Sequence, residues 1–271
     1  MIAPVPASLM TARTLLGALV WRARREGLGY LRPGAILLAC IAGLQLALGL
    51  VTGPGGVNGA GALGDYARRF GVDTHAAQIG ATLATVPGQF ALILSITGAL
   101  TVRALVGSEA TRGAIEALLA AGYRPRAIVA AVLAFTELLV AVSWLCLALP
   151  VVAWVQLTLM VYGSHAYLNL AYVVVLLIVP LFAALSGTAL AVTVAILAPR
   201  LTQQGQLGLA GGGGLESVVA VVPALAVLVV QLTVSSVSSA VLLGATIGGT
   251  ALLLVVGIQL ASSRFRVEGV L

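Results

Sequence analysis

The sequence predicts an all-α protein that crosses a membrane several times, and three observations lead to this prediction. Of the 271 residues, 61% are hydrophobic and only 8% are charged, whereas about a quarter of the residues of a soluble domain are charged. The hydrophobic residues gather in six runs of a length that can cross the hydrocarbon core as a helix. No run alternates like a membrane β-strand, so helices are expected to satisfy the backbone hydrogen bonds.

The six predicted spans fill the part of the chain from residue 34 to 262, which we expect to form one transmembrane domain. The serine-rich cluster from Ser235 to Ser239 separates the last two spans and predicts a tight turn. The third span can extend beyond Leu149 as far as Val155. The expected spans are approximately 34–51, 80–106, 127–149, 170–197, 218–237 and 239–260.

The distribution of arginine predicts the orientation of the spans. Every basic residue is Arg, and in a six-span arrangement nearly all of them share one side with both termini. The opposite side has only Arg68 and Arg69, which Asp65 and Asp73 offset. Basic connections face the cytoplasm, so we expect a multi-pass plasma-membrane protein with both termini cytoplasmic, including a tail at 263–271. The arginines form no continuous basic stripe, so nucleic acid is not an expected partner.

Residues 1–33 are expected to form an amphipathic element on the cytoplasmic membrane surface. Between Ser8 and Tyr30 the leucines mix with arginines, as in helices that lie in the interface with their arginines toward anionic headgroups. Trp21 and Tyr30 suit the same depth. The alternative is a basic tail whose charges are simply solvated.

Several kinds of chemistry are not expected in this chain. A standard ATP-binding P-loop needs Lys to reach the phosphates, and the sequence has none. His75 and His165 have no second ligand at helical spacing, and no G-x-S-x-G nucleophile motif occurs. We therefore expect no enzymatic activity, metal or cofactor. Cys40 and Cys146 lie inside apolar runs and are expected to be buried free thiols.

The connection between the second and third spans, about residues 107–122, predicts a short amphipathic cytoplasmic helix. Apolar and charged side chains fall on two different helical faces. Ser108 suits the start of this helix, Gly122 suits its end, and Pro125 suits the start of the next one. The apolar face consists of Ile115, Leu118 and Leu119, and the charged face consists of Glu109, Arg112 and Glu116.

This connection resembles the cytoplasmic loop of type-2 ATP-binding-cassette permeases. The matching pattern is Glu109…Arg112-Gly113-x-Ile115-Glu116-x-Leu118-Leu119, a short turn, and Arg124-Pro125-Arg126-x-Ile128. Members of this family are usually exporters with six membrane helices per subunit. Some carry re-entrant outer helices before the last span, for which Ser235–Ser239 leaves no room here.

The resemblance implies a function and a set of partners. The segment would be a coupling helix that docks on a separate cassette ATPase, which binds the ATP and Mg. A second copy of the chain, or a paralogous permease, would complete a transporter that exports a hydrophobic or amphipathic drug, lipid or peptide. The alternative for the loop is a generic amphipathic linker with solvated charges. The implied coupling residues are Glu109, Arg112, Gly113, Glu116, Gly122, Arg124 and Arg126.

Polar residues inside the spans are a second group of candidates. Glu137 lies about ten residues into the third span, where a charge is costly, so it either serves transport or is a protonated side chain bonded to a neighbour. Thr85, Gln89 and Gln231 either line a translocation path or form hydrogen bonds between helices.

The alternatives to a transporter are a membrane scaffold and a membrane enzyme. A six-span scaffold or assembly factor would not depend on an ATPase. A membrane enzyme would need a constellation of catalytic side chains that the sequence does not provide.

Overall fold

The computed structural model describes residues 12–26, 32–52, 77–103, 114–161, 168–197, 214–233 and 239–267. Their regular structure is helical throughout. Glu109, Arg112, Gly113 and the Ser235–Ser238 part of the expected turn lie outside these ranges. The helices are α1 (Ala12–Glu26), α2 (Arg32–Thr52), α4 (Ala77–Val102), α6 (Ala114–Ala120), α7 (Pro125–Val161), α8 (Leu170–Leu197), α10 (Leu215–Thr233) and α11 (Ser239–Val267).

Four of these helices are long and apolar enough to cross a membrane. The qualifying segments are Ile79–Val102 of α4, Pro125–Val161 of α7, Leu170–Leu197 of α8 and Val241–Ala261 of α11. Shorter apolar stretches lie in α2 and α10, over Arg32–Ala47 and Leu215–Gln231. The all-helical prediction is therefore confirmed over the described residues, with four candidate spans where the sequence predicted six.

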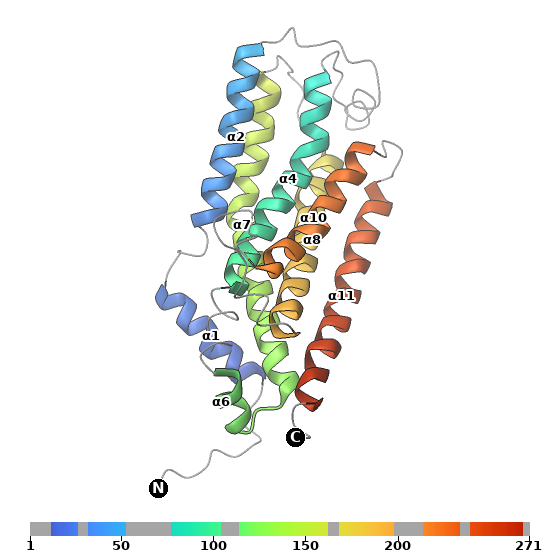
Figure 1. The fold of residues 1–271 in the computed structure, drawn as a ribbon. Helices are drawn as coiled ribbons and strands as arrows, with labels where there is room; N and C mark the ends of the chain where they lie inside the picture. Colours follow the sequence, from blue (N-terminus) through green and yellow to red (C-terminus); the bar gives the residue numbers. More distant parts are fainter. Residues whose placement is uncertain are drawn as a thin grey trace.

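Helix α4 lies at the centre of the bundle. It packs against α2, α7, α8 and α10, and Figure 1 shows these helices around it. Its buried side chains include Leu83, Phe90 and Leu94, none of which is exposed at all. These side chains therefore lie in the close-packed interior, away from lipid and water. Helix α8, which contacts α4, α7, α10 and α11, shares this central position.

Glycines allow the helices around α4 and α8 to approach closely. A Cβ built on Gly187 of α8 would overlap the carbonyl oxygen of Ala220 on α10. A Cβ on Gly88 of α4 would lie 2.6 Å from Leu228 Cδ1 of α10. Small residues at such crossings are the usual means of helix association in membranes, where no hydrophobic force drives the helices together. Packing of α10 thus depends on two glycines of its neighbours.

Proline residues lie inside four of the helices and remove one backbone donor each. In α4, Pro87 cannot donate to the carbonyl oxygen of Leu83. The hydroxyl of Tyr172 on α8 donates to this oxygen instead, at 3.0 Å. A second side chain reaches backbone in the same way, since Trp144 Nε1 of α7 donates to Leu177 O of α8 at 2.8 Å. Side chains of neighbouring helices therefore supply donors to backbone oxygens near the prolines.

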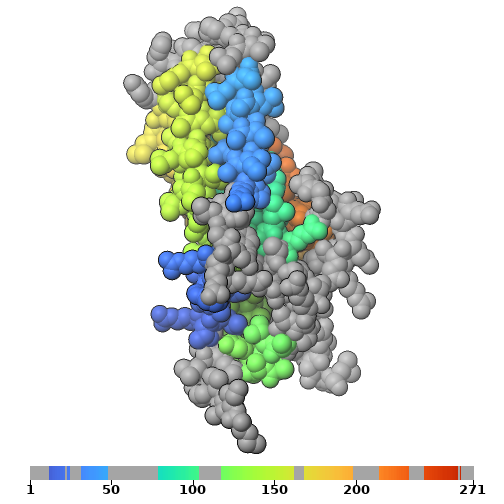
Figure 2. Space-filling view, turned by 90° about the vertical axis from the view of Figure 1, so that its left-hand side faces the viewer, coloured from blue at the N-terminus to red at the C-terminus, as the bar shows by residue number. Residues whose placement is uncertain are grey.

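Helix α7 is longer than the sequence predicted. It has 37 residues and continues through Pro150 to Val161, which gives a length of about 55 Å. Helix α2 packs beside it from part of the way along, because Gly34 lies against Leu147 and against Thr97 of α4. Helix α1 contacts α7 as well, and it lies below α2 in Figures 1 and 2. Helices α1 and α2 therefore follow each other along one side of α7.

The outer surface of the bundle is largely apolar. Exposed side chains include Leu149 of α7, which is 80% exposed, and Leu252 of α11, which is 64% exposed. Cys40 and Cys146 are both free, as predicted, but they are exposed on this surface rather than buried. A thiol behaves as a small hydrophobe, so an apolar surround suits it on the outside of the bundle as well.

Candidate functional site

The turn between α6 and α7 is built around Gly122. Its φ of 89° lies in the left-handed region, which glycine adopts without a steric penalty. Gly122 N donates to Leu119 O at 2.9 Å, and Tyr123 N donates to Leu118 O at 3.1 Å. These two bonds form a Schellman motif, which satisfies carbonyls at the end of α6. The prediction that the helix stops at Gly122 is confirmed.

Helix α7 starts three residues after Gly122, as the sequence predicted from Pro125. The carbonyl oxygen of Arg124 accepts hydrogen bonds from Ala127 N at 2.8 Å and from Ile128 N at 3.2 Å. Proline suits this first position because its missing N–H would have no partner there. The α6–α7 connection is therefore short and well defined, because two hydrogen bonds fix the end of α6 and α7 begins three residues after Gly122.

The predicted coupling residues within the described ranges lie on this turn or beside it. Glu116 is in α6, and Arg124 and Arg126 are exposed at the start of α7. Leu118 and Leu119, from the predicted apolar face of α6, are half-buried. Helix α6 contacts α7, the longest of the described helices.

Arginines gather at the end of the bundle that carries α6. Figure 1 shows α1, α6 and the C-terminal end of α11 at this end. Arg13 at the start of α1 is exposed there, as are Arg124 and Arg126. Arg24 of α1 and Arg103 after α4 are exposed as well, but α4 ends well above α6 in Figure 1.

Thr85 and Gln89 lie on a narrow, half-exposed strip of α4. The other described side chains of this helix are buried, apart from the exposed Arg103 at its end. Figure 2 shows part of α4 at the surface beside α2. The strip recurs every three to four residues and so follows one side of the helix. Its half-buried members are Ala81, Thr85, Gln89, Leu92, Ile96 and Leu100.

Two polar atoms of this strip, Thr85 Oγ1 and Gln89 Oε1, have hydrogen-bond partners within the protein. Thr85 Oγ1 donates to Ala81 O at 2.8 Å, so it bonds within its own helix. Gln89 Oε1 accepts from Gln45 Nε2 of α2 at 3.0 Å. Gln45 was not among the residues predicted from the sequence, although it is a polar residue inside an apolar run. For Gln89, the structure therefore contains the interhelical hydrogen bond that was one of the two predicted roles.

Gln231 lies at the same level of the bundle as Thr85. Gly88 of α4 packs against Leu228 of α10, and the two helices run in opposite directions (Figure 1). Thr85 lies three residues before Gly88, and Gln231 lies three residues after Leu228. Because the helices are antiparallel, both residues are displaced from the contact in the same direction. Gln231 is only 5% exposed, and neither atom of its amide has a hydrogen-bond partner among the described residues. A buried amide without partners is unusual in a folded protein and needs an explanation, such as a bond to a group outside the described residues.

Glu137 lies away from this polar group. Gly98 of α4 packs against Val140 of α7. Gln89 lies nine residues before Gly98, and Glu137 lies three residues before Val140. Because α4 and α7 are antiparallel (Figure 1), these two residues are on opposite sides of the contact. The separation is therefore about 18 Å along the helix axis. Both carboxyl oxygens of Glu137 are buried and have no hydrogen-bond partner among the described residues. One of the two predicted roles was a protonated Glu137 bonded to a neighbouring group, and no such neighbour is found among the described residues.

Glu216 is a buried acidic residue that the sequence analysis missed. It lies in the first turn of α10 and is 0% exposed. Its Oε1 accepts from Gly214 N at 3.1 Å, while Oε2 has no partner among the described residues. An acidic residue directly before an apolar run is a signal for a helix N-terminus, where it complements the helix dipole. That signal could have identified Glu216 as the start of α10.

The described residues contain no group of three His, Cys, Asp or Glu side chains that could hold a metal ion. Comparison of the chain with protein-family models, with curated proteins and with solved structures gives no match.

Proposed function

We propose that this chain is the membrane-spanning permease subunit of an ATP-binding-cassette transporter, driven by a separate ATPase subunit. The chain itself would be no enzyme, and ATP and Mg would bind to the ATPase. The transporter would export a hydrophobic or amphipathic compound such as a drug, lipid or peptide. The observation that carries this proposal is the Gly122 turn, which joins the short helix α6 to the 37-residue helix α7.

The geometry of α6 suits a coupling element. A soluble partner that pushes on α6 meets a helix of seven residues whose C-terminal end is fixed by the Schellman motif. Because Pro125 starts α7 three residues after Gly122, there is no long loop to absorb the movement. Conformational change at the ATPase would therefore reach the interior of the membrane through a single continuous helix.

The proposal includes six crossings and cytoplasmic termini. Helices α2 and α10 have 21 and 19 residues, close to the length that a transmembrane helix needs. With α4, α7, α8 and α11 they would give an even number of crossings. The exposed arginines at the end with α1 and α6 support a cytoplasmic location for that end in the plasma membrane. Helix α1, with Trp21 57% exposed, would lie in the interface there.

We assign the translocation path to the half-exposed strip of α4 with Gln89 and to nearby Gln231. A second copy of the chain, or a paralogous permease, would cover this strip from the other side. The amides of Gln45, Gln89 and Gln231 would then offer hydrogen bonds to the polar part of an amphipathic compound, and apolar strip residues would contact its hydrocarbon part. ATP binding would shift the two subunits between inward-facing and outward-facing states.

The test is co-purification with a candidate cassette ATPase, followed by measurement of ATPase activity and export in lipid vesicles. Charge reversals are placed at Arg112, Glu116, Arg124 and Arg126, one at a time. Arg13→Glu serves as the matched control, because Arg13 is an exposed arginine at the same end of the bundle but belongs to α1. We expect the four reversals to weaken ATPase binding by about tenfold, which corresponds to about 1.4 kcal/mol.

Two results would count against the proposal. If no ATPase binds the wild-type chain, the transporter is ruled out in favour of a membrane scaffold or assembly factor. If the ATPase binds but Arg13→Glu weakens it as much as the other reversals, the docking surface is a diffuse positive end rather than the α6–α7 turn.

A further inference from the structure

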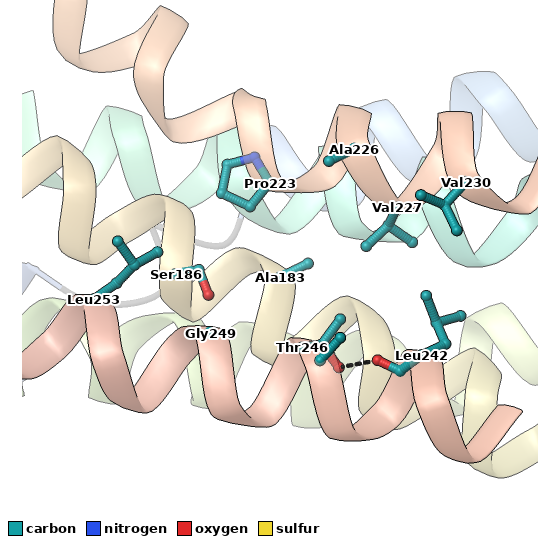
Figure 3. A pocket seen from close by; sticks show the side chains of 11 residues that line it. Ala183, Ser186, Pro223, Ala226, Val227, Val230, Leu242, Thr246, Gly249 and Leu253 are labelled. Carbon is teal, nitrogen blue, oxygen red and sulfur yellow. Dashed lines mark hydrogen bonds between the residues drawn. The ribbon is translucent and has the colours of Figure 1, made fainter. Parts of the chain in front are cut away.

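A pocket of about 260 Å³ lies between α8, α10 and α11, away from the strip of α4. Figure 3 shows α10 on one side of it, α11 on the other and α8 behind. The lining is almost entirely apolar and includes Pro223, Val227 and Val230 of α10 with Leu242 and Leu253 of α11. Gly249 of α11 also lines it, and the space at its Cα is open.

The few hydroxyl groups near the pocket are already bonded to protein. Thr246 Oγ1 lies 3.0 Å from both Leu242 O and Leu243 O, one turn earlier in α11, and Figure 3 shows the first of these bonds. Ser186 Oγ lies 2.9 Å from Phe182 O and 2.7 Å from Thr250 Oγ1. The pocket therefore offers little to a polar group, and its occupant is selected by shape and apolar contact.

Neither water nor empty space suits this pocket. An ordered water needs two to four polar partners, which the lining does not provide. An empty pocket would lose the dispersion contacts of the side chains around it. The surface around the pocket is apolar and exposed, with Val222 of α10 and Ile247 of α11 at 52% and 43% exposure. In a membrane, such a surface is in contact with the hydrocarbon chains of lipids.

We propose that the pocket binds one acyl chain of a membrane phospholipid. Its volume is slightly below the range of about 300–1,000 Å³ that is usual for drug-sized ligands, so a single slender chain suits it better than a bulky compound. The acyl chain would enter between α10 and α11 and lie against α8. This inference is independent of the proposed transport function, because it depends only on the apolar lining and the lipid-facing surface.

The test uses a phosphatidylcholine that carries a diazirine in one acyl chain, mixed into vesicles with the full-length protein. After illumination, mass spectrometry of peptides locates the labelled residues. Gly249→Leu fills the pocket, and Gly248→Leu is the matched control. Both glycines have open space at the Cα, both changes add the same side chain to α11, and Gly248 does not line the pocket. Ala226→Leu fills the pocket from the α10 side.

The proposal expects labelling at Ala226, Val227 and Leu242 in the wild type. Gly249→Leu and Ala226→Leu should each reduce it at least fivefold, while Gly248→Leu should leave it within a factor of two. Equal labelling in all variants would overturn the proposal, as would labelling spread evenly over every exposed apolar residue. A third result would also contradict the proposal. If the pocket is labelled only after a dimer of the protein is dissociated, the second copy of the protein, and not a lipid, occupies the pocket.

Discussion

The hydroxyl of Tyr172 on α8 donates a hydrogen bond to the carbonyl oxygen of Leu83 on α4, at 3.0 Å. This is the oxygen that Pro87 cannot bond, because proline has no backbone N–H. Tyr172 and Leu83 are both 0% exposed, so water cannot replace the phenol. The two central helices are thus joined at the point where α4 lacks a hydrogen bond of its own.

Replacing Tyr172 with Phe should lower the free energy of unfolding by about 1–3 kcal/mol, the usual cost of leaving a buried polar group without a partner. The measurement is thermal or denaturant-induced unfolding in detergent. Pro87→Ala restores the donor within α4, so Tyr172→Phe should cost less in that background. An equal cost in both backgrounds would show that the phenol does not compensate for the proline.

Gly187→Ala should destabilise the bundle by about 1–3 kcal/mol, as overpacking does in a close-packed core. The new methyl group would overlap the carbonyl oxygen of Ala220, which is backbone and cannot rotate away. The matched control is Gly249→Ala, where the same methyl group meets open space and helix propensity improves by about 1 kcal/mol. Equal stability of the two variants would contradict the close approach of α8 and α10.

Gly122→Ala should cost about 1–2 kcal/mol at the turn, because alanine is strained in the left-handed region. Gly122→Asn should cost less, since asparagine tolerates this conformation. If α6 transmits movement to α7, export should fall in the alanine variant more than in the asparagine variant, with ATPase binding retained in both. The measurements are export in vesicles and co-purification. Unchanged export in Gly122→Ala would show that the shape of this turn is not used in coupling.

Glu137→Leu should raise stability, and it should reduce export if the carboxyl serves transport, which is one of its two predicted roles. The two carboxyl oxygens are buried without a hydrogen-bond partner among the described residues, and such a group costs about 1–3 kcal/mol or more. Leucine has no polar atoms and removes this cost. Replacing a residue that is retained for function often raises the stability of a protein in this way. Unfolding in detergent and export in vesicles measure the two effects. A less stable leucine variant would reveal a partner of Glu137, and full export would leave the carboxyl without a role in transport.

Apart from α1 and α6, which are amphipathic, the helices were predictable from the sequence because each is mainly an apolar run. Residues 170–197 were predicted as a span, and α8 has these same ends. The end of α7 was placed too early, at Leu149 or Val155, because hydropathy does not show how far a helix continues through Pro150 and beyond the core. The stop at Gly122 was predictable because a glycine after an amphipathic stretch has one main structural use.

The contacts between helices were not predictable, because they depend on rotation and register rather than on composition. Gly187 meets Ala220, and Gly249 meets open space, yet both are glycines in apolar helices. In the same way, nothing local links Gln45 to Gln89, which lie 44 residues apart in the chain. Thr85, Gln89, Gln231 and Glu137 were selected as polar residues in apolar runs, and only the packing separates Glu137 from the other three.

The threonines in the interior have a consequence for the movement of protons through the bundle. Thr97, Thr101, Thr188 and Thr193 each donate a hydrogen bond to the carbonyl four residues earlier in the same helix, at 2.8–2.9 Å. A hydroxyl has one proton to donate, and each of these is held by its own backbone. While these bonds are intact, none of the four hydroxyls can donate to a neighbouring side chain, so they form no hydrogen-bonded chain along which a proton could pass between them.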